Sequence, residues 1–132
     1  FLPEGMTAFC SYYAKAFPGL GILIAENGMS QRCSRDNSVV AHRPDKILRS
    51  DYLEAHLREV RRMLDQGVPL LGYLHWSLTD NYEWGSFTPR FGLYRIDFAK
   101  GLERLPIDHM GDNPSRTYAR LVREFGLGGM GS

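Results

Sequence analysis

Hydrophobic positions follow two different spacings along the chain, one typical of helices and one of buried strands. Near the N-terminus apolar residues recur every three or four positions, which predicts a helix with one apolar face. Pro18-Gly19 is expected to end this helix. The residues of the predicted face are Met6, Phe9, Cys10, Tyr13, Ala14 and Phe17.

Two apolar runs predict strands. Leu20 to Ala25 is continuously apolar and rich in β-branched or aliphatic residues, as in a parallel strand buried on both faces. Val68 to His75 predicts a second strand. Between them, Ser50 is expected to cap a helix that ends at Gly67. The inward positions of that helix are Leu53, Leu57, Val60 and Leu64.

The remaining segments complete an α/β pattern. Residues 29–44 are polar and aperiodic, and Phe91 to Phe98 predicts a short β excursion. Pro114 is expected to begin a last helix, and the tail from Gly126 to Ser132, with four glycines, is expected to be flexible. The inward residues of the last helix are Tyr118, Leu121, Val122 and Phe125. Helices that alternate with strands in this order indicate an α/β fold.

Polar residues follow directly after each predicted strand. The first strand ends in Glu26-Asn27-Gly28, and barrel or doubly wound enzymes place their chemistry at this end of a strand. Asn27-Gly28 favours a sharp turn that tolerates positive φ. By itself Glu26 is a weak signal, because a strand-end glutamate can equally pair with a neighbouring basic residue.

The second strand leads into a cluster rich in aromatic and acidic side chains, from Tyr73 to Trp84. Aromatic rings can stack on the C–H face of a pyranose, and carboxylates can accept hydrogen bonds from vicinal hydroxyls. The cluster therefore predicts a sugar site. The alternative is a surface turn whose aromatic side chains pack into the core.

These motifs resemble those of family 1 glycoside hydrolases, the β-glucosidase and β-galactosidase family. Ile24 to Met29 resembles the nucleophile motif of that family. Gly72 to Trp84, followed by Arg90 to Asp97, resembles its long glycone-binding signature. The resemblance extends over nearly the whole chain, and further matching positions are Arg49, Tyr52-Leu53, His56-Leu57 and Asn113 to Tyr118.

The chain departs from the family pattern in three respects. Ala25 stands where the nucleophile motif usually has Thr, and the loop from Gly85 to Pro89 is one residue shorter than the commonest form. The Asn-Glu-Pro motif that carries the family's general acid/base does not occur in the chain. A complete (β/α)8 barrel needs about 250 residues, and this chain has 132. We therefore expect residues 1–125 to be the last two βα units of a TIM barrel, with 126–132 as a tail.

The resemblance implies a retaining β-glycosidase and assigns a role to five residues. Glu26 is implied as the nucleophile, and Glu83 as the acceptor of two glycone hydroxyls. The resemblance implies that Trp76 forms the floor under the sugar ring and that the indole N–H of Trp84 donates to a sugar hydroxyl. Phe91 is implied as an apolar wall of the site. In a retaining enzyme the nucleophile and the acid/base lie about 5–5.5 Å apart. A cation or several hydrogen-bond donors are expected beside Glu26 to keep it ionised.

The implied substrate is a terminal, non-reducing β-linked neutral sugar, on a glycoside or an oligosaccharide. The activity is expected to be β-glucosidase-like with β-galactosidase or β-fucosidase side activity. No cofactor is implied. The implied partner is the N-terminal part of the barrel, which would supply the acid/base, so the chain alone is expected to be inactive. Two other hypotheses stay open: a non-catalytic sugar-binding module, and a structural remnant that folds poorly or self-associates. Glu26 favours the first hypothesis, because a lectin needs no carboxylate beneath the anomeric carbon.

Composition adds few constraints. Sixteen basic and 15 acidic residues give a net charge of +1, which does not indicate a nucleic-acid or membrane partner. No membrane span or signal peptide is visible, and a cytoplasmic location is expected. Cys10 is expected to be a buried thiol and Cys33 to lie in a loop, although a disulfide between them stays open. No metal site is indicated by ligand spacing.

Other polar residues are expected to serve structure. His56 and His75 are interpreted as core histidines whose hydrogen bonds are satisfied. Asp80 and Asn81 are expected to cap a turn, and Arg90 to lock that loop by pairing with a carboxylate. The following charged residues are interpreted as a solvated helical face: Arg43, Arg49, Asp51, Arg58, Glu59, Arg61 and Arg62.

Overall fold

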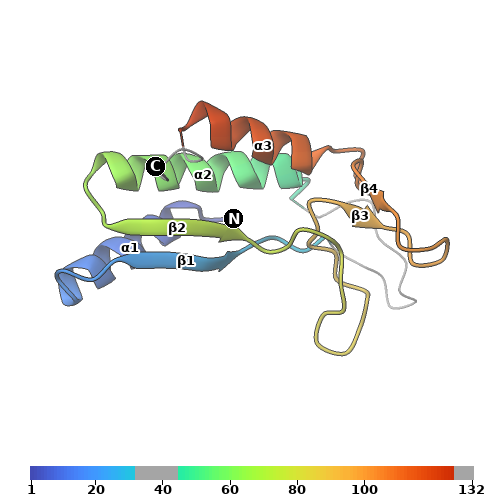
Figure 1. Ribbon diagram of the computed structural model, residues 1–132, viewed down its shortest axis with the longest axis horizontal. Helices are drawn as coiled ribbons and strands as arrows, with labels where there is room; N and C mark the ends of the chain where they lie inside the picture. The colour runs from blue at the N-terminus through green and yellow to red at the C-terminus, as the bar shows by residue number, and fades with distance from the viewer. Residues whose placement is uncertain (32–44, 127–132) are drawn as a thin grey trace.

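The structure is a computed structural model that describes residues 1–31 and 45–126. These residues form helices α1 (Glu4–Ala16), α2 (Arg49–Asp65) and α3 (Pro114–Glu124), and strands β1 (Ile22–Asn27), β2 (Leu70–His75), β3 (Arg95–Ile96) and β4 (Arg104–Leu105) (Figure 1). The predicted order of helices and strands is confirmed. Cys33, Arg43 and the 127–132 tail lie outside the described residues.

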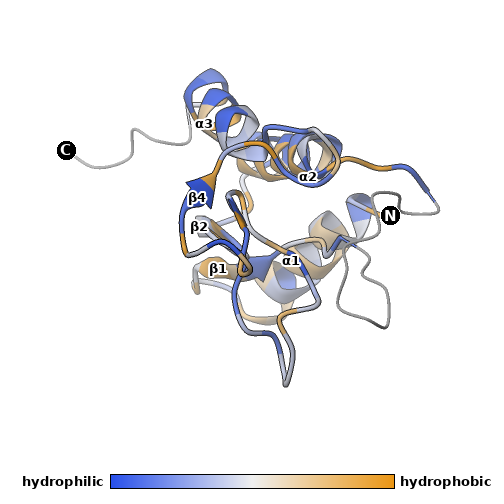
Figure 2. Ribbon diagram, turned by 90° about the vertical axis from the view of Figure 1, so that its right-hand side faces the viewer, coloured by the Kyte–Doolittle hydropathy of each residue, from blue (hydrophilic) through white to orange (hydrophobic). Residues whose placement is uncertain are grey.

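Strands β1 and β2 pair in parallel, and α2 connects them as a crossover helix. Helices α1 and α2 lie to one side of the two strands (Figure 2). The core fills the space between α2, α3 and this side of the sheet, as the apolar spacing predicts. Its most deeply buried side chains, each at most 4% exposed, are Leu53, Leu57, Val60, Met63 and Leu121.

The opposite face of the β1–β2 sheet is uncovered in the described part of the chain. Leu23, Leu71 and Leu74 expose 52%, 75% and 53% of their surface. The prediction that the first strand is buried on both faces is therefore wrong for this chain. The physical reason is that helices cover only one side of a two-stranded sheet. The composition of β1 suits a strand with apolar neighbours on both sides.

The predicted apolar face of α1 is also only partly buried. Cys10 is buried as a free thiol, whereas Phe9, Tyr13 and Phe17 are about half or more exposed. The helix contacts α2 and β1 along one narrow stripe, and its aromatic residues project beyond these contacts. The amphipathic spacing therefore predicts the helix correctly but does not predict what covers it.

One expected helix boundary, the start of α2, needs correction. Helix α2 begins at Arg49, and the Asp51 carboxylate accepts the Leu48 backbone N–H at 3.1 Å. The Ser50 hydroxyl instead donates to Asp112 at 2.6 Å, so Ser50 ties α2 to the segment before α3 and does not cap the helix. Gly67 follows the end of α2 at φ +78°, and Pro114 begins α3, both as predicted.

The expected β excursion over 91–98 is shorter than predicted. Only Arg95–Ile96 forms strand β3, which pairs antiparallel with β4. The residues before it are held to the loop after β2 instead, where the Tyr94 N–H donates to the Leu78 carbonyl at 3.0 Å. These contacts to a distant segment replace the ladder that the alternation suggested.

Candidate active site

The ends of β1 and β2 meet closely. The Trp76 N–H donates to the Asn27 carbonyl at 3.0 Å, and the Tyr73 hydroxyl donates to the Asn27 side chain at 2.8 Å. A Cβ on Gly28 would lie only 1.9 Å from the Trp76 carbonyl oxygen, so glycine is required for this approach. Gly28 does not have positive φ. The reason for the glycine is therefore proximity to Trp76 and not the turn that the sequence suggested.

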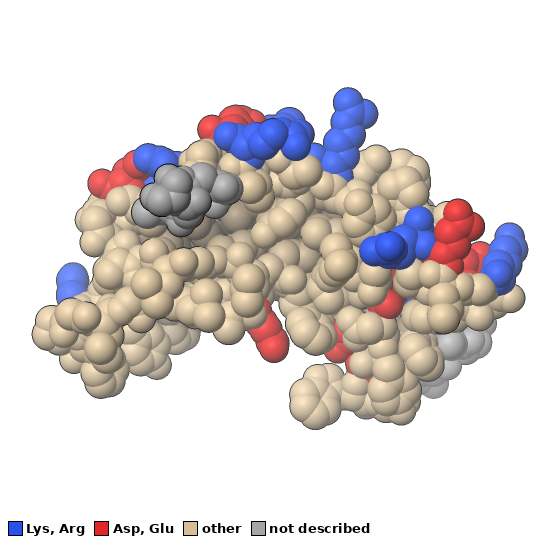
Figure 3. Space-filling model, in the orientation of Figure 1, with Lys and Arg blue, Asp and Glu red and all other residues tan. Residues whose placement is uncertain are grey.

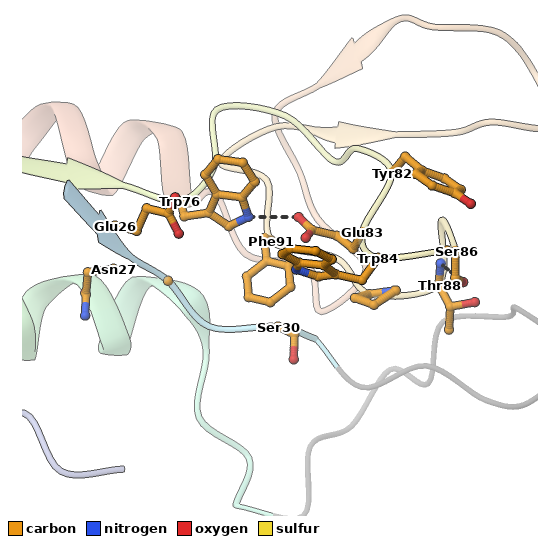
Figure 4. A pocket seen from close by; sticks show the side chains of 13 residues that line it. Glu26, Asn27, Ser30, Trp76, Tyr82, Glu83, Trp84, Ser86, Thr88 and Phe91 are labelled. Atoms are coloured by element: carbon orange, nitrogen blue, oxygen red, sulfur yellow. Dashed lines mark hydrogen bonds between the residues drawn. The ribbon is translucent and has the colours of Figure 1, made fainter.

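An open cavity of about 1330 Å³ lies at these strand ends. It is bounded by the end of β1 on one side and by the 76–91 segment on the other (Figure 4). All five residues of the predicted site line it: Glu26, Trp76, Glu83, Trp84 and Phe91. Two distant parts of the sequence are thus brought to one cavity.

Glu26 lies at the mouth of β1 and is exposed to solvent. Its carboxylate makes no hydrogen bond or ion pair with the residues that the structure describes. The cation or donors expected beside it are therefore not supplied by residues 1–31 or 45–126. The alternative interpretation, a salt bridge with a neighbouring basic residue, also has no support within these ranges.

Glu83 has a very different environment. Only 9% of its surface is exposed, and its Oε1 accepts the indole N–H of Trp76 at 2.8 Å (Figure 4). Backbone hydrogen bonds between Glu83 and Ser86 close the turn that carries Trp84. The contact between Glu83 and Trp76 was not predicted, because residues seven apart in a loop have no spacing that signals it.

The two tryptophans also differ in their exposure to solvent, as Glu26 and Glu83 do. Trp84 adopts φ +46° at the tip of the turn, and its side chain is fully exposed. Trp76 is 38% exposed and is oriented by its hydrogen bond to Glu83. One indole is thus fixed in the wall of the cavity, and the other stands free at its rim. The peptide bond between Trp76 and Ser77 is cis.

Asp80 holds the two arms of the loop together. Its carboxylate accepts the backbone N–H groups of Gly92 at 3.0 Å and Ile96 at 3.1 Å. Arg90 lies 3.8 Å from the same carboxylate, with both side chains buried, and its guanidinium covers the Phe98 ring. Asn81 donates to Ser77 and to the Thr79 carbonyl. The predicted structural roles of Asp80, Asn81 and Arg90 are confirmed.

His75 lies beneath this loop at the end of β2. Burial, and then the nearby Arg49 cation, lower its pKa from 6.5 to about 4, while the carbonyls of Phe91 and Asn27 partly offset the effect. Neither ring nitrogen makes a well-formed hydrogen bond within the described residues. His75 is therefore a core histidine, as predicted, but it is not a satisfied one. His56 is buried and its Nδ1 donates to the Tyr52 carbonyl at 2.9 Å, as expected.

The largest difference between a predicted and an observed environment is at Arg49. Its interpretation as part of a solvated helical face is wrong, because it is only 1% exposed and contacts Asp108, Met29 and Arg90. A signal was present, because position 49 precedes Leu53 and Leu57 at steps of four, on the apolar side of α2. Glu59 is also largely covered and accepts the Thr7 hydroxyl at 2.5 Å. Arg58, Arg61 and Arg62 are about half exposed, as expected.

Within the described ranges, no group of three or more histidine, cysteine or acidic residues is arranged to hold a metal ion. None of the helices in this part of the chain is long and apolar enough to cross a membrane.

Aromatic rings and carboxylates at the carboxyl ends of parallel strands are the features of a sugar site on an α/β scaffold. Comparison with known proteins gives the same class and specifies it. Residues 1–110 match the model of glycosyl hydrolase family 1. The chain belongs to this family.

Individual members of this family are similar to the chain in sequence and in structure. The chain is 36% identical over 107 residues to peroxisomal β-glucosidase 26 of Arabidopsis thaliana, covering 79% of this chain and 19% of that protein. It is 38% identical over 99 residues to a β-galactosidase of Sulfolobus acidocaldarius, covering 74% and 18%. The structure of a family 1 β-glucosidase from Thermotoga maritima matches with a TM-score of 0.70 and 29% identity, over 93% of this chain and 26% of that one. The chain therefore spans only about a fifth to a quarter of these relatives.

Proposed function

We propose that this chain carries the nucleophile and the glycone site of a retaining β-glycosidase, as the last two βα units of a TIM barrel. The observation that supports this most is the common cavity. A strand-end carboxylate from β1 and an aromatic and acidic cluster after β2 line one space, although about 50 residues separate them in the sequence. Barrel enzymes build their active sites from several strand ends in this way.

In this proposal Glu26 attacks the anomeric carbon and forms a covalent glycosyl-enzyme, and the aglycone oxygen leaves with a proton from a second carboxylic acid. The resulting carboxylate then takes a proton from the water that attacks the anomeric carbon and releases the sugar from Glu26. Glu26 is exposed and has no ion-pair partner in the described part of the chain, so its carboxylate is accessible for the first step. The second carboxyl group must come from outside this chain. We therefore expect the 132-residue chain alone to turn over substrate at or near background.

Glu83, Trp76, Trp84 and Phe91 are proposed to bind the glycone. The Oε1 atom of Glu83 accepts the indole N–H of Trp76, and its Oε2 has no hydrogen-bond partner within the described residues. Oε2 can therefore accept a sugar hydroxyl while the hydrogen bond to Trp76 fixes the carboxylate. The proposed acceptance of two glycone hydroxyls is compatible with this contact, because each carboxylate oxygen has two lone pairs.

A neutral hexose suits these residues better than a phosphorylated one. Among residues 1–31 and 45–126, no Lys or Arg side chain, which would favour a phosphate, lines the cavity. The proposed activity is β-glucosidase-like, with β-galactosidase or β-fucosidase side activity. Relatives that are named as a β-glucosidase and as a β-galactosidase support a glycone site of this kind.

The proposed partner is the N-terminal part of a family 1 barrel. Figure 3 shows that charged side chains gather over α2, α3 and the β3–β4 region, whereas the surface over β1, β2 and α1 carries few. This weakly charged surface contains the exposed leucines of the sheet and the exposed aromatic residues of α1. Apolar area of this extent favours burial against another layer. In the Thermotoga maritima enzyme three quarters of the chain has no counterpart here, and we propose that an equivalent part covers this surface.

The first test uses a 2-deoxy-2-fluoro-β-glucoside with a dinitrophenyl leaving group, which needs little acid assistance. The chain would be incubated with this probe alone, and together with the N-terminal part of a related family 1 barrel. Mass spectrometry should find one covalent sugar on the peptide that contains Glu26. An adduct only in the mixture would indicate that the chain is one part of a split active site.

Two variants provide the controls. Glu26→Gln should abolish the adduct, whereas Glu103→Gln, at an exposed position away from the cavity, should leave it unchanged. An adduct on another residue, or none from a chain shown to be folded by a cooperative melt, would contradict the proposed function. Sugar affinity without any adduct would favour the binding-module alternative.

A further inference from the structure

We infer that Arg49 is a positioning residue, which fixes the segment that follows Glu26 relative to the loop that carries Trp76 and Glu83. This inference rests on the proposed function for its catalytic meaning. The contacts of the buried Arg49 guanidinium group support the positioning role independently of that function.

The Arg49 side chain reaches three separate segments. Its Nη2 donates to the Arg90 carbonyl at 2.6 Å and to the Met29 carbonyl at 3.2 Å. Its Nη1 lies 3.4 Å from Oδ2 of Asp108. The side chain is 1% exposed, so these contacts have little competition from water.

Two of these segments belong to the proposed active site. Met29 follows Glu26 by three residues, and Arg90 immediately precedes Phe91 in the cavity wall. The same segments also meet directly, because the Gln31 N–H donates to the Arg90 carbonyl at 2.8 Å. The Arg90 carbonyl thus accepts from both Gln31 and Arg49, at the junction between the two halves of the site.

The third segment completes the arrangement. Asp108 accepts Gln31 Nε2 at 2.6 Å on the oxygen that faces Arg49. Its other oxygen accepts the backbone N–H groups of Met110 and Asp112, at 2.8 and 3.0 Å. Asp108 is therefore held rigidly and compensates the buried charge of Arg49. The network joins α2, the β1 end, the 76–94 segment and the loop before α3.

Only an arginine can make these contacts together. Its planar guanidinium offers donors in a fixed fork, whereas a lysine offers one ammonium on a flexible chain. Loss of the fork should let the β1 end move relative to the sugar-binding wall. A displacement of about 1 Å between reacting groups can lower a rate by about 100-fold. The expected signature is a slower attack by Glu26 with little change in sugar affinity.

The test compares Arg49→Lys and Arg49→Met with Arg61→Lys, a control on the exposed side of the same helix. The first measurement is amide hydrogen exchange of the 132-residue chain. We expect Arg49→Lys to accelerate exchange of the Gln31 N–H at least tenfold, with Val60 in the middle of α2 unchanged. Arg49→Met should give a larger effect of the same kind, and Arg61→Lys should give none.

The second measurement is the rate of Glu26 labelling by the fluorinated glucoside, in the mixture with the N-terminal barrel part. Arg49→Lys should lower the maximal labelling rate at least tenfold, while the half-saturating probe concentration changes less than threefold. Equal acceleration of the Gln31 and Val60 amides would overturn the inference, because it would mean a loss of overall stability. An unchanged labelling rate in Arg49→Lys would overturn it as well.

Failure of the proposed function gives a distinct result. If the wild-type mixture forms no adduct, the catalytic proposal fails and the exchange comparison alone decides whether Arg49 fixes the two segments. Selective acceleration at Gln31 would then support the positioning role. Uniform or absent acceleration would reject it.

Discussion

Among the described residues, two carboxylates line the cavity, and their environments are opposite. Glu83 is buried, bonded to Trp76 and carried by a loop that Asp80 and Arg90 hold in place. Glu26 is exposed and unpaired within the described residues. The 76–94 segment is thus held by contacts within this chain, whereas the Glu26 carboxylate has no hydrogen-bond or ion-pair partner among residues 1–31 and 45–126.

This difference indicates how the site is divided. Glycone recognition needs fixed hydrogen-bond geometry, and the loop after β2 obtains it from its own buried polar groups. Control of a nucleophile's charge needs cations or donors beside it, and residues 1–31 and 45–126 supply none to Glu26. The following predictions test this division, from the largest expected effect to the smallest.

Asp80→Ala should cause the largest loss of stability. It removes the acceptor of two buried N–H groups and leaves the buried Arg90 without its carboxylate. The expected decrease in the free energy of unfolding is about 3–5 kcal/mol, measured by urea denaturation. Asp65→Ala, which removes an exposed ion pair with Arg61, should cost no more than about 0.5 kcal/mol. Equal costs would contradict the view that the 76–94 segment is internally braced.

The free energy of unfolding should also decrease as the pH is lowered, because of His75. Its pKa is about 4 in the folded chain and 6.5 in the unfolded one, so the unfolded state binds more protons between these values. The contribution is complete above pH 6.5 and is lost progressively as the pH falls toward 4. The difference between these two pKa values corresponds to a loss of at most roughly 3 kcal/mol in the free energy of unfolding.

The measurement compares wild type and His75→Leu by urea denaturation from pH 7.5 to pH 4. Burial also lowers the pKa values of His56 and His109, and these groups remain in both proteins. The difference between the two curves therefore isolates His75. Parallel curves would show that the ring is not buried under the loop as described.

Trp76→Phe should have an intermediate effect. The substitution keeps an aromatic ring but removes the N–H that Glu83 accepts, and leaves a carboxylate oxygen buried without a partner. The expected cost is about 1–3 kcal/mol. Adding Glu83→Gln should recover part of it, as a double-mutant cycle would measure. Exact additivity would mean that the hydrogen bond does not stabilise the site.

Trp84→Ala should have the smallest effect on stability. Its side chain is fully exposed, and we expect a change within about 0.5 kcal/mol. Removal of one ring contact of roughly 0.5–1.5 kcal/mol should still weaken sugar binding by up to about tenfold. The half-saturating probe concentration in the labelling experiment measures this. A large loss of stability would show that Trp84 packs against the protein and is not a free rim residue.

Local spacing determined the elements and the motifs of this chain. The order of the helices and the parallel βαβ unit could be predicted from this spacing, and the resemblance to family 1 glycoside hydrolases named five residues that line the cavity. The periodicity of apolar residues predicts which side chains face a core, and the end of a strand predicts where polar side chains gather. Both signals are local, so they survive when a large part of the surrounding fold is absent.

Tertiary structure decided what covers each apolar face and which charges are buried. Helical spacing and the apolar strand run each predict burial, yet Leu53 is buried and Leu23 is 52% exposed. Burial depends on neighbouring layers that neither pattern contains. Arg49 looks like other charged residues of its helix until Met29, Arg90 and Asp108 converge on it. A buried charge is tolerated only where distant partners compensate it. Those partners come together only in the folded chain.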